Sequence, residues 1–191
     1  MIISNKNPQS LEGQLLIATP MLVDSVFHHS VIYICLHSSE GAMGIIINHV
    51  IQSLNLSDIM DQLGIAAHQM ANNHPIYFGG PVDVSRGFVL HTADYSRSET
   101  VIMGENIALT ANLEIMKDIA SGHGPSETVL ALGYAGWEAN QLEKEMEENS
   151  WISVPATKEL IFNIPNSDKW RKSAESGGID LTKLSSTVGH A

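Results

Sequence analysis

The chain has 191 residues, of which 43% are hydrophobic and 16% charged, and its net charge is −11. That length suits one domain spanning 1–191, with a core large enough to need no disulfide or metal staple. The apolar content excludes a disordered acidic chain. The negative charge repels phosphate, so direct nucleic acid binding is not expected. We expect flexible ends at 1–10 and about 183–191.

The single cysteine, Cys35, excludes a disulfide scaffold. It lies in the apolar run Val31–Leu36 with no Lys or Arg nearby to favour a thiolate, so we predict a buried, inert thiol. Residues 1–10 lack the apolar core of a signal peptide. No stretch approaches the ~20 apolar residues of a membrane span. We therefore expect a cytoplasmic protein without a membrane anchor.

The first half of the chain predicts strands separated by turns. The apolar run Gln14–Ala18 ends at Thr19-Pro20 and predicts a strand. Val31–Leu36 and Ile45–Ile47 are apolar at every position, which is typical of strands covered on both faces. The turn residues 38–41 between them predict a hairpin. Further on, Ser57 is expected to cap a short helix that ends near Gly64.

The second half predicts strands in clusters, with helices between some of them. A polar loop at 72–74 precedes predicted strands at 75–78, 87–90 and 100–103. A helix from Thr110 to Gly122 follows, and then a strand at 128–132, a tight connection at 133–136 and a helix at 137–148. Short elements are predicted at 151–154, 157–162 and 168–176. Since strands and helices do not alternate steadily, the pattern favours an α+β fold over a doubly wound parallel sheet.

The familiar catalytic motifs are absent from the sequence. There is no dinucleotide or P-loop glycine pattern, no zincin H-E-x-x-H and no G-x-S-x-G nucleophile elbow. Nine histidines raise the question of a metal. A hairpin turning near residue 40 would place His37 opposite Met43 and separate it from His49 by roughly 20 Å, too far for one ion. We predict neither a metal site nor a cofactor.

The predicted helix at 137–148 is strongly acidic. Helical spacing places Trp137, Gln141 and Glu145 on one face. Glu147 and Glu148 lie at its negative end, where the helix dipole disfavours them. These carboxylates either form a solvated face or bind something basic, and the sequence leaves both open.

Several segments together resemble the AlgH/YqgE family across nearly the whole chain. They are Leu16–Pro20, Ser30–His37, Glu40–Asn48, Gly79–Val82, Gly87–His91, Leu132–Trp137, Gln141–Glu143, Trp151, Gly177–Asp180 and Gly189–Ala191. Two positions depart from the family pattern: His49-Val50 replaces Arg/Lys-Pro, and Asn140 stands where Gly is usual. The resemblance implies a bifurcated, mostly antiparallel sheet curled into a pseudo-barrel with flanking helices. It also carries the label of transcriptional regulator, without an established catalytic residue, cofactor or ligand.

Glycines at predicted strand ends lie beside polar and aromatic residues, where binding sites are often built. The candidate binding surface consists of Asn48, Gly79, Gly80, Pro81, His91, Tyr134, Gly136, Trp137 and Gln141. The alternative is that the glycines only make turns and that Trp137 belongs to the core.

Three functions stay open at this stage. The first is a non-enzymatic binding or regulatory domain that acts through a protein or small-molecule partner. The second is an enzyme of unrecognised class, with a pocket at Gly79-Gly80-Pro81 and Gly133–Trp137. The third is a direct transcriptional regulator, although Arg86, Arg97 and Arg171 are dispersed and form no basic face. A pocket whose titratable groups touch one another would indicate the enzyme, and isolated polar groups in a shallow groove would indicate the binder.

Overall fold

A computed structural model describes residues 10–23, 25–66 and 74–184. The strands are β1 (Gln14–Ala18), β2 (Val31–Ser38), β3 (Gly41–Ile46), β4 (Val50–Asn55), β5 (Pro75–Phe78), β6 (Val82–Thr92), β7 (Thr100–Gly104), β8 (Ile107–Thr110), β9 (Thr128–Glu138) and β10 (Trp151–Pro155). The helices are α1 (Leu56–Gln62), α2 (Leu113–Ala120), α3 (Gln141–Glu147), the π-helix η2 (Glu159–Asn163), α4 (Asn166–Ser176) and α5 (Leu181–Leu184). None of these helices is long and apolar enough to cross a membrane.

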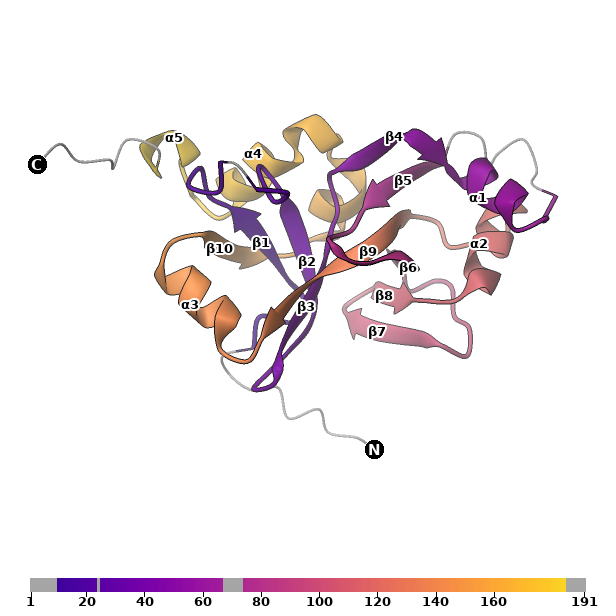
Figure 1. Ribbon diagram of the computed structural model, residues 1–191, viewed down its shortest axis with the longest axis horizontal. Coiled ribbons are helices and arrows are strands. Elements are labelled where there is room, and N and C mark those ends of the chain that lie inside the picture. Colours follow the sequence, from indigo (N-terminus) through magenta and orange to yellow (C-terminus); the bar gives the residue numbers. More distant parts are fainter. Residues whose placement is uncertain (1–9, 24, 67–73, 185–191) are drawn as a thin grey trace, which may run out of the picture.

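The strands form one mostly antiparallel sheet in the order β10-β1-β2-β3-β9-β6-β8-β7. The long strand β9 is where the sheet divides. Its second half pairs with β3, from Ala135 to Glu138, while its first half lies between β6 and the parallel strand β5. The sheet curls into a half-barrel with helices around it, as Figure 1 shows, so the α+β fold with a bifurcated, curled sheet is confirmed.

The predicted hairpin forms the centre of this sheet. Strands β2 and β3 pair along their length, with a bulge between Ile34 and Leu36 that moves the register by one residue. His37 therefore faces Ala42 instead of Met43. Its ring bonds at both nitrogens, Nδ1 accepting from the Leu11 amide at 2.9 Å and Nε2 lying 2.8 Å from Glu143.

The expected helix at 137–148 is wrong in its first part, because β9 continues to Glu138. Trp137 lies in the sheet opposite Ala42, and α3 begins only at Gln141. The expected tight connection at 133–136 is also part of this strand. Gly133 has φ +73°, and a Cβ there would lie 2.4 Å from the Gly80 carbonyl oxygen, so glycine lets β9 kink without ending.

Two helix starts also differ from the sequence prediction. Thr110 ends strand β8 between Val89 and Thr100, and α2 begins at Leu113 behind an Asn112 cap. Helix α1 is capped by Asn55, not Ser57. Asn55 accepts from the Asp58 amide, and the Asp58 carboxylate accepts from the Asn55 amide at 2.8 Å. This reciprocal capping box satisfies two backbone donors that the helix itself leaves free.

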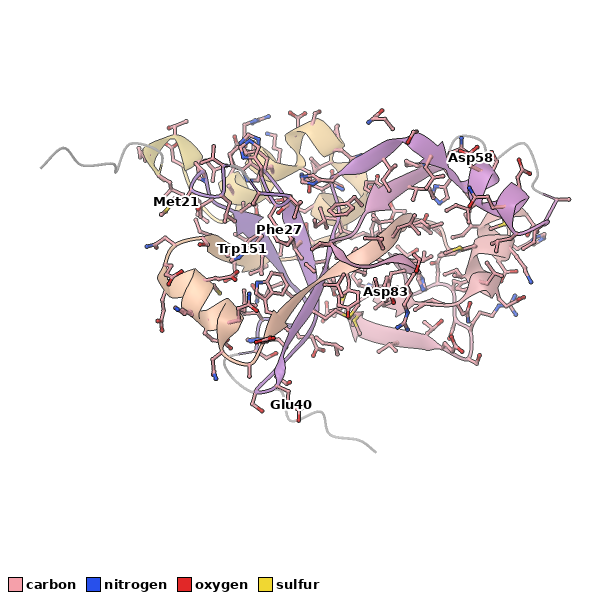
Figure 2. The ribbon with its side chains drawn as sticks, viewed as in Figure 1. Met21, Phe27, Glu40, Asp58, Asp83 and Trp151 are labelled. Carbon is pink, nitrogen blue, oxygen red and sulfur yellow. The ribbon has the colours of Figure 1, made fainter. Side chains whose placement is uncertain are left out.

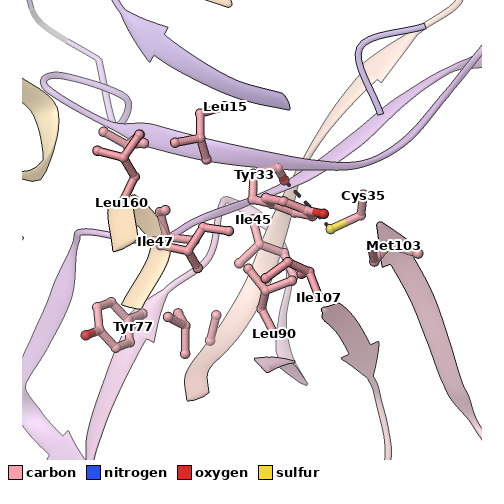
Figure 3. Packing of buried hydrophobic residues seen from close by; sticks show 14 of the residues in the cluster. Leu15, Tyr33, Cys35, Ile45, Ile47, Tyr77, Leu90, Met103, Ile107 and Leu160 are labelled. Carbon is pink, nitrogen blue, oxygen red and sulfur yellow. Dashed lines mark hydrogen bonds between the residues drawn. The ribbon is translucent and has the colours of Figure 1, made fainter. Parts of the chain in front are cut away.

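The concave face of the sheet encloses the main core. Figure 3 shows Tyr33 and Cys35 of β2 packed with Ile45, Leu90 and Met103, contributed by three further strands. Cys35 is fully buried, as predicted, and its thiol lies 3.7 Å from the Tyr33 carbonyl. Burial raises the pKa of this thiol to about 12.

A second core cluster lies under α3. It contains Trp137 and Trp151, whose rings meet edge to face with centroids 5.9 Å apart. Phe27 also packs edge to face on Trp151, with centroids 5.5 Å apart (Figure 2). A third cluster joins α1 and α2 to β5, β6 and β9, as Met60, Ile115 and Leu130 show.

The ends expected to be flexible, and the polar loop at 72–74, lie largely outside the described residues. Lys183 and Leu184 are described and belong to α5. His74, the last residue of the predicted loop, bonds through Nε2 to the Thr128 hydroxyl at 2.7 Å.

Candidate functional site

Strand β6 carries a large bulge opposite the kink of β9. Val82 pairs with Tyr134 and Gly87 with Leu132, so four residues of β6, 83–86, arch away from the sheet. Asp83 begins the arch with φ +47°, and its side chain is labelled in Figure 2. Two grooves lie at the ends of this arch, one at Val82, the residue before it, and the other at Arg86.

The first groove, here called the helix groove, lies between α1, α2 and β6 and has a volume of about 460 Å³. Its apolar wall comes from Leu54, Ile59, Leu63, Leu113, Met116 and Leu132. Leu63 and Leu113 remain 47% and 38% exposed, so part of this apolar surface is open to solvent. An open apolar surface in a concave site is typical of a ligand site.

Arg86 is the charged residue of the helix groove. Its guanidinium lies 5.1 Å from the centroid of the Phe88 ring, a cation–π contact that positions the side chain. Within the described part of the chain, Arg86 forms no ion pair with a carboxylate.

The other described cations are already bound. Those paired with carboxylates are Arg97, Arg171, Lys117, Lys144, Lys158, Lys172 and Lys183. Lys169 is 1% exposed and donates to the carbonyls of Ile47, at 3.2 Å, and Ile161, at 2.6 Å. Burial lowers its pKa to about 8. Arg86 is therefore the described cation whose charge is available to a ligand.

The second groove, here called the hairpin groove, lies between the β2–β3 hairpin and β9. Of the residues predicted from sequence, it brings together Tyr134, Gly136 and Trp137, with Val82 and Met43 beside them. Its charged groups are the acidic Glu40 and Glu138. Gln141 lies at one end, where its side chain accepts from the Glu138 amide at 2.9 Å and donates to Glu145 at 2.8 Å.

The predicted glycines at 79 and 80 lie beneath this region. Both are buried, and a Cβ on Gly80 would lie 2.1 Å from the Tyr134 carbonyl carbon. They allow the chain after β5 to cross directly against β9. Pro81 follows them and is exposed.

Asn48 and His91 line neither groove, and their side chains form hydrogen bonds with backbone groups. Asn48 accepts from the Val31 amide at 2.8 Å and donates to the His29 carbonyl at 2.9 Å. His91 is fully buried, with its ring nitrogens 2.8 Å from the Thr92 carbonyl and 2.9 Å from the Thr110 hydroxyl. Burial lowers the pKa of His91, which favours its neutral form.

Titratable side chains touch one another elsewhere, in a cluster that lines neither groove. The Tyr95 hydroxyl bonds to the Asp118 carboxylate, and Arg97 bonds to both. These contacts lower the pKa of Asp118, although burial opposes them as the largest single effect. Among the described residues, no group of three or more His, Cys, Asp or Glu is arranged to hold a metal ion.

Comparison with known proteins agrees with this architecture. Residues 15–182 match the AlgH-like family DUF179. The chain is 44% identical to a UPF0301 protein of Rhodospirillum rubrum over 97% of each chain, and 47% identical to one of Mesorhizobium japonicum over 95% and 93%. The solution structure of the AlgH protein from Pseudomonas aeruginosa is 36% identical, covers 99% of this chain and all of its own, and superimposes with a TM-score of 0.80.

This chain therefore belongs to the AlgH-like family, a group of uncharacterised function. A Corynebacterium diphtheriae protein at 22% identity shares the fold, with a TM-score of 0.70 over 91% of each chain.

Proposed function

We propose that this chain is a cytoplasmic binding domain, without a catalytic role, that acts through a partner and binds an anionic ligand with an apolar body. The ligand occupies the helix groove, with its anionic group on Arg86 and its apolar part against α1 and α2. The observation that carries this proposal is that Arg86, which pairs with no described carboxylate, lines a groove whose leucines are partly exposed.

Charge favours a ligand of this kind at this place. With a net charge of −11, the molecule as a whole repels anions, and the other described cations are neutralised by carboxylates or bound to carbonyls. Arg86 is a local exception. A guanidinium matches the two oxygens of a carboxylate in a bidentate pair. Because one arginine supplies one positive charge, we choose a carboxylate at the end of an apolar chain over a dianionic phosphate.

The distribution of polar groups supports binding over catalysis. In the helix groove, the polar groups around Arg86 are Gln62, Ser85 and Asn112, and none of them is an acid, a histidine or a cysteine. The titratable groups that touch one another in the cluster of Tyr95, Arg97 and Asp118 lie outside it, and so do His37 and Glu143. A groove with isolated polar groups fits a binding site, whereas an active site places perturbed titratable groups in contact within the cavity.

Calorimetric titration with decanoate below its micelle concentration tests the proposal. We expect saturable binding to the wild-type chain and a loss of at least about tenfold in affinity for Arg86→Gln, since a hydrogen bond to a charged group contributes about 1.5–3 kcal/mol. Arg171→Gln is the matched control, because Arg171 is already paired with Asp168 and Glu175 on α4. Equal binding by wild type and Arg86→Gln would refute the proposal.

Charge also disfavours direct binding of nucleic acid by this chain. The unpaired guanidinium of Arg86 is a single positive site, and a protein needs several to hold a duplex at physiological salt. We propose that any regulatory effect of this domain passes through a partner. A gel shift at submicromolar protein that persists with competitor DNA would show the opposite.

Tyr134, Gly136 and Trp137 remain our proposed surface for that partner. They line the hairpin groove, which lies at the other end of the β6 arch from the helix groove. Tyr134→Ala should weaken partner capture. Because the Tyr134 ring packs on Phe88, which positions Arg86, Glu138→Lys in the same groove is the variant that should leave decanoate binding unchanged.

A further inference from the structure

Strand β7 forms one edge of the sheet. It ends the strand order and pairs with β8 alone in the described part of the chain, and Figure 1 shows it at the outer margin of the molecule. In an antiparallel ladder, every second residue of an edge strand directs its N–H and C=O groups away from its neighbour. Such an edge can accept another strand unless side chains or bulges protect it.

The side chains of β7 give little of that protection. Val101 and Ile102 are 53% and 60% exposed, and the strand from Thr100 to Gly104 contains no charge and no proline. The other edge strands, β10 and β4, carry such protection. Strand β10 ends in Pro155, and β4 exposes the polar residues Gln52 and Ser53.

The edge is also held firmly at both ends. The Thr100 hydroxyl accepts from the Arg97 amide at 2.9 Å and bonds to the Thr110 hydroxyl at 2.7 Å. At the other end, a bulge between Ile102 and Gly104 turns Met103 into the core, where it is 5% exposed. Because a bulge also protects an edge, the stretch of β7 open to a partner is Thr100–Ile102. A preformed strand loses little conformational entropy when another strand pairs with it.

Negative charge surrounds this apolar edge. Glu99 and Glu105 flank β7 and are exposed, and neither forms an ion pair with a described cation. Glu12 adds a third carboxylate, since the next residue, Gly13, lies close to the Met103 carbonyl. A partner segment that pairs with this edge should therefore carry positive charge.

We propose that β7 accepts one added strand from a partner protein, an extended apolar segment flanked by lysine or arginine. The partner's backbone would extend the sheet beyond β7, its apolar side chains would cover Val101 and Ile102, and its basic ends would meet Glu99 and Glu105. A second copy of this chain is a poor occupant. Two β7 strands paired antiparallel about Ile102 would place Glu99 opposite Glu105 of the other copy, and like charges in that position are destabilising.

The test uses a labelled nonapeptide, Lys-Lys-Thr-Val-Thr-Val-Thr-Lys-Lys, and the same peptide with glutamates in place of its lysines. Fluorescence anisotropy should show about tenfold tighter binding of the lysine peptide. In the variant with Glu99→Lys and Glu105→Lys, this preference should reverse. Amide chemical shifts should change mainly at Thr100–Gly104 and in β8.

Further variants separate this edge from the helix groove. Ile102→Pro, checked for folding by circular dichroism, should lose peptide binding, because proline removes an amide donor and is disfavoured in paired strands. Arg86→Gln should bind the peptide as the wild type does, so failure of the proposed ligand function would leave this result intact. Equal binding of the two peptides, shift changes centred elsewhere, or a dimer that dissociates in the charge-reversed variant would each overturn the proposal.

Discussion

Trp137 and Trp151 donate their indole N–H groups to the same carboxylate oxygen, Oε2 of Glu145, at 2.9 and 2.8 Å. The other oxygen, Oε1, accepts from the side-chain amide of Gln141 at 2.8 Å. One carboxylate on α3 thus joins the helix to β9 and β10. This arrangement lets both tryptophans be buried with their polar N–H groups satisfied.

We expect Trp137→Ala to destabilise the fold by about 3–5 kcal/mol, because the ring is 7% exposed and packed in the core under α3. Urea unfolding measures this change. Trp137→Phe is the matched variant: it keeps most of the apolar contact, loses the bond to Glu145, and should cost less. A midpoint for Trp137→Ala near that of the wild type would mean that the ring serves the hairpin groove and not the core.

Asn140 should tolerate glycine better than alanine. It has φ +61° and ψ +4°, a left-handed conformation, and its side chain makes no capping bond to α3. Glycine adopts this conformation without strain. We expect Asn140→Ala to cost roughly 1 kcal/mol and Asn140→Gly to lie within about 0.5 kcal/mol of the wild type. Equal stability of the two variants would contradict the conformation described.

Lys169 should make stability depend on pH above neutrality. Its pKa falls from an ordinary value near 10.5 to about 8 on folding, so between these pH values the unfolded chain binds more protons. Stability conferred by the neutral amine therefore rises with pH across this window.

The comparison of wild type with Lys169→Met isolates this effect, since Tyr33 and Cys35 titrate in both. From pH 7.5 to 9.5, the wild type should gain roughly 1–2 kcal/mol relative to the variant in urea unfolding. A difference between the two proteins that does not change with pH would show that Lys169 keeps its ordinary pKa.

Cys35 should react slowly with a thiol reagent in the native protein and quickly after denaturation. The side chain is fully buried, and its raised pKa leaves very little thiolate at neutral pH. Time-resolved labelling with and without urea measures both rates. Native labelling as fast as that of the unfolded chain would require β2 to open locally.

Local sequence patterns predicted the strands whose environment is uniform along their length. The runs at 14–18, 31–36 and 75–78 are strands because most of their side chains are apolar and buried, with Leu36, which is 54% exposed, as the exception. Strand β9 was predicted only as far as Leu132. Its continuation depends on the fit of Gly133 against Gly80 and on the pairing of Trp137 with Ala42, contacts between residues distant in sequence.

The candidate site residues, like the strands, could be predicted only where neighbouring residues in the sequence form the pattern. Tyr134, Gly136 and Trp137 were recognisable as aromatic and glycine residues grouped in sequence, and the fold brings them to one groove. Arg86 was not singled out as a site residue, because a lone arginine before a strand has no distinctive pattern. Its significance comes from the absence of a carboxylate partner within the described residues and from its place in the lining of a groove with apolar walls.

The central claim is that Arg86 recognises the carboxylate of an apolar ligand, and a thermodynamic cycle tests it most directly. The affinities of decanoate and decanol are measured by calorimetry for the wild type and for Arg86→Gln. We predict that the wild type prefers decanoate by at least about tenfold, that Arg86→Gln abolishes this preference, and that decanol binds both proteins equally. If the preference for decanoate is unchanged in Arg86→Gln, or if neither ligand binds the wild type, the claim is contradicted.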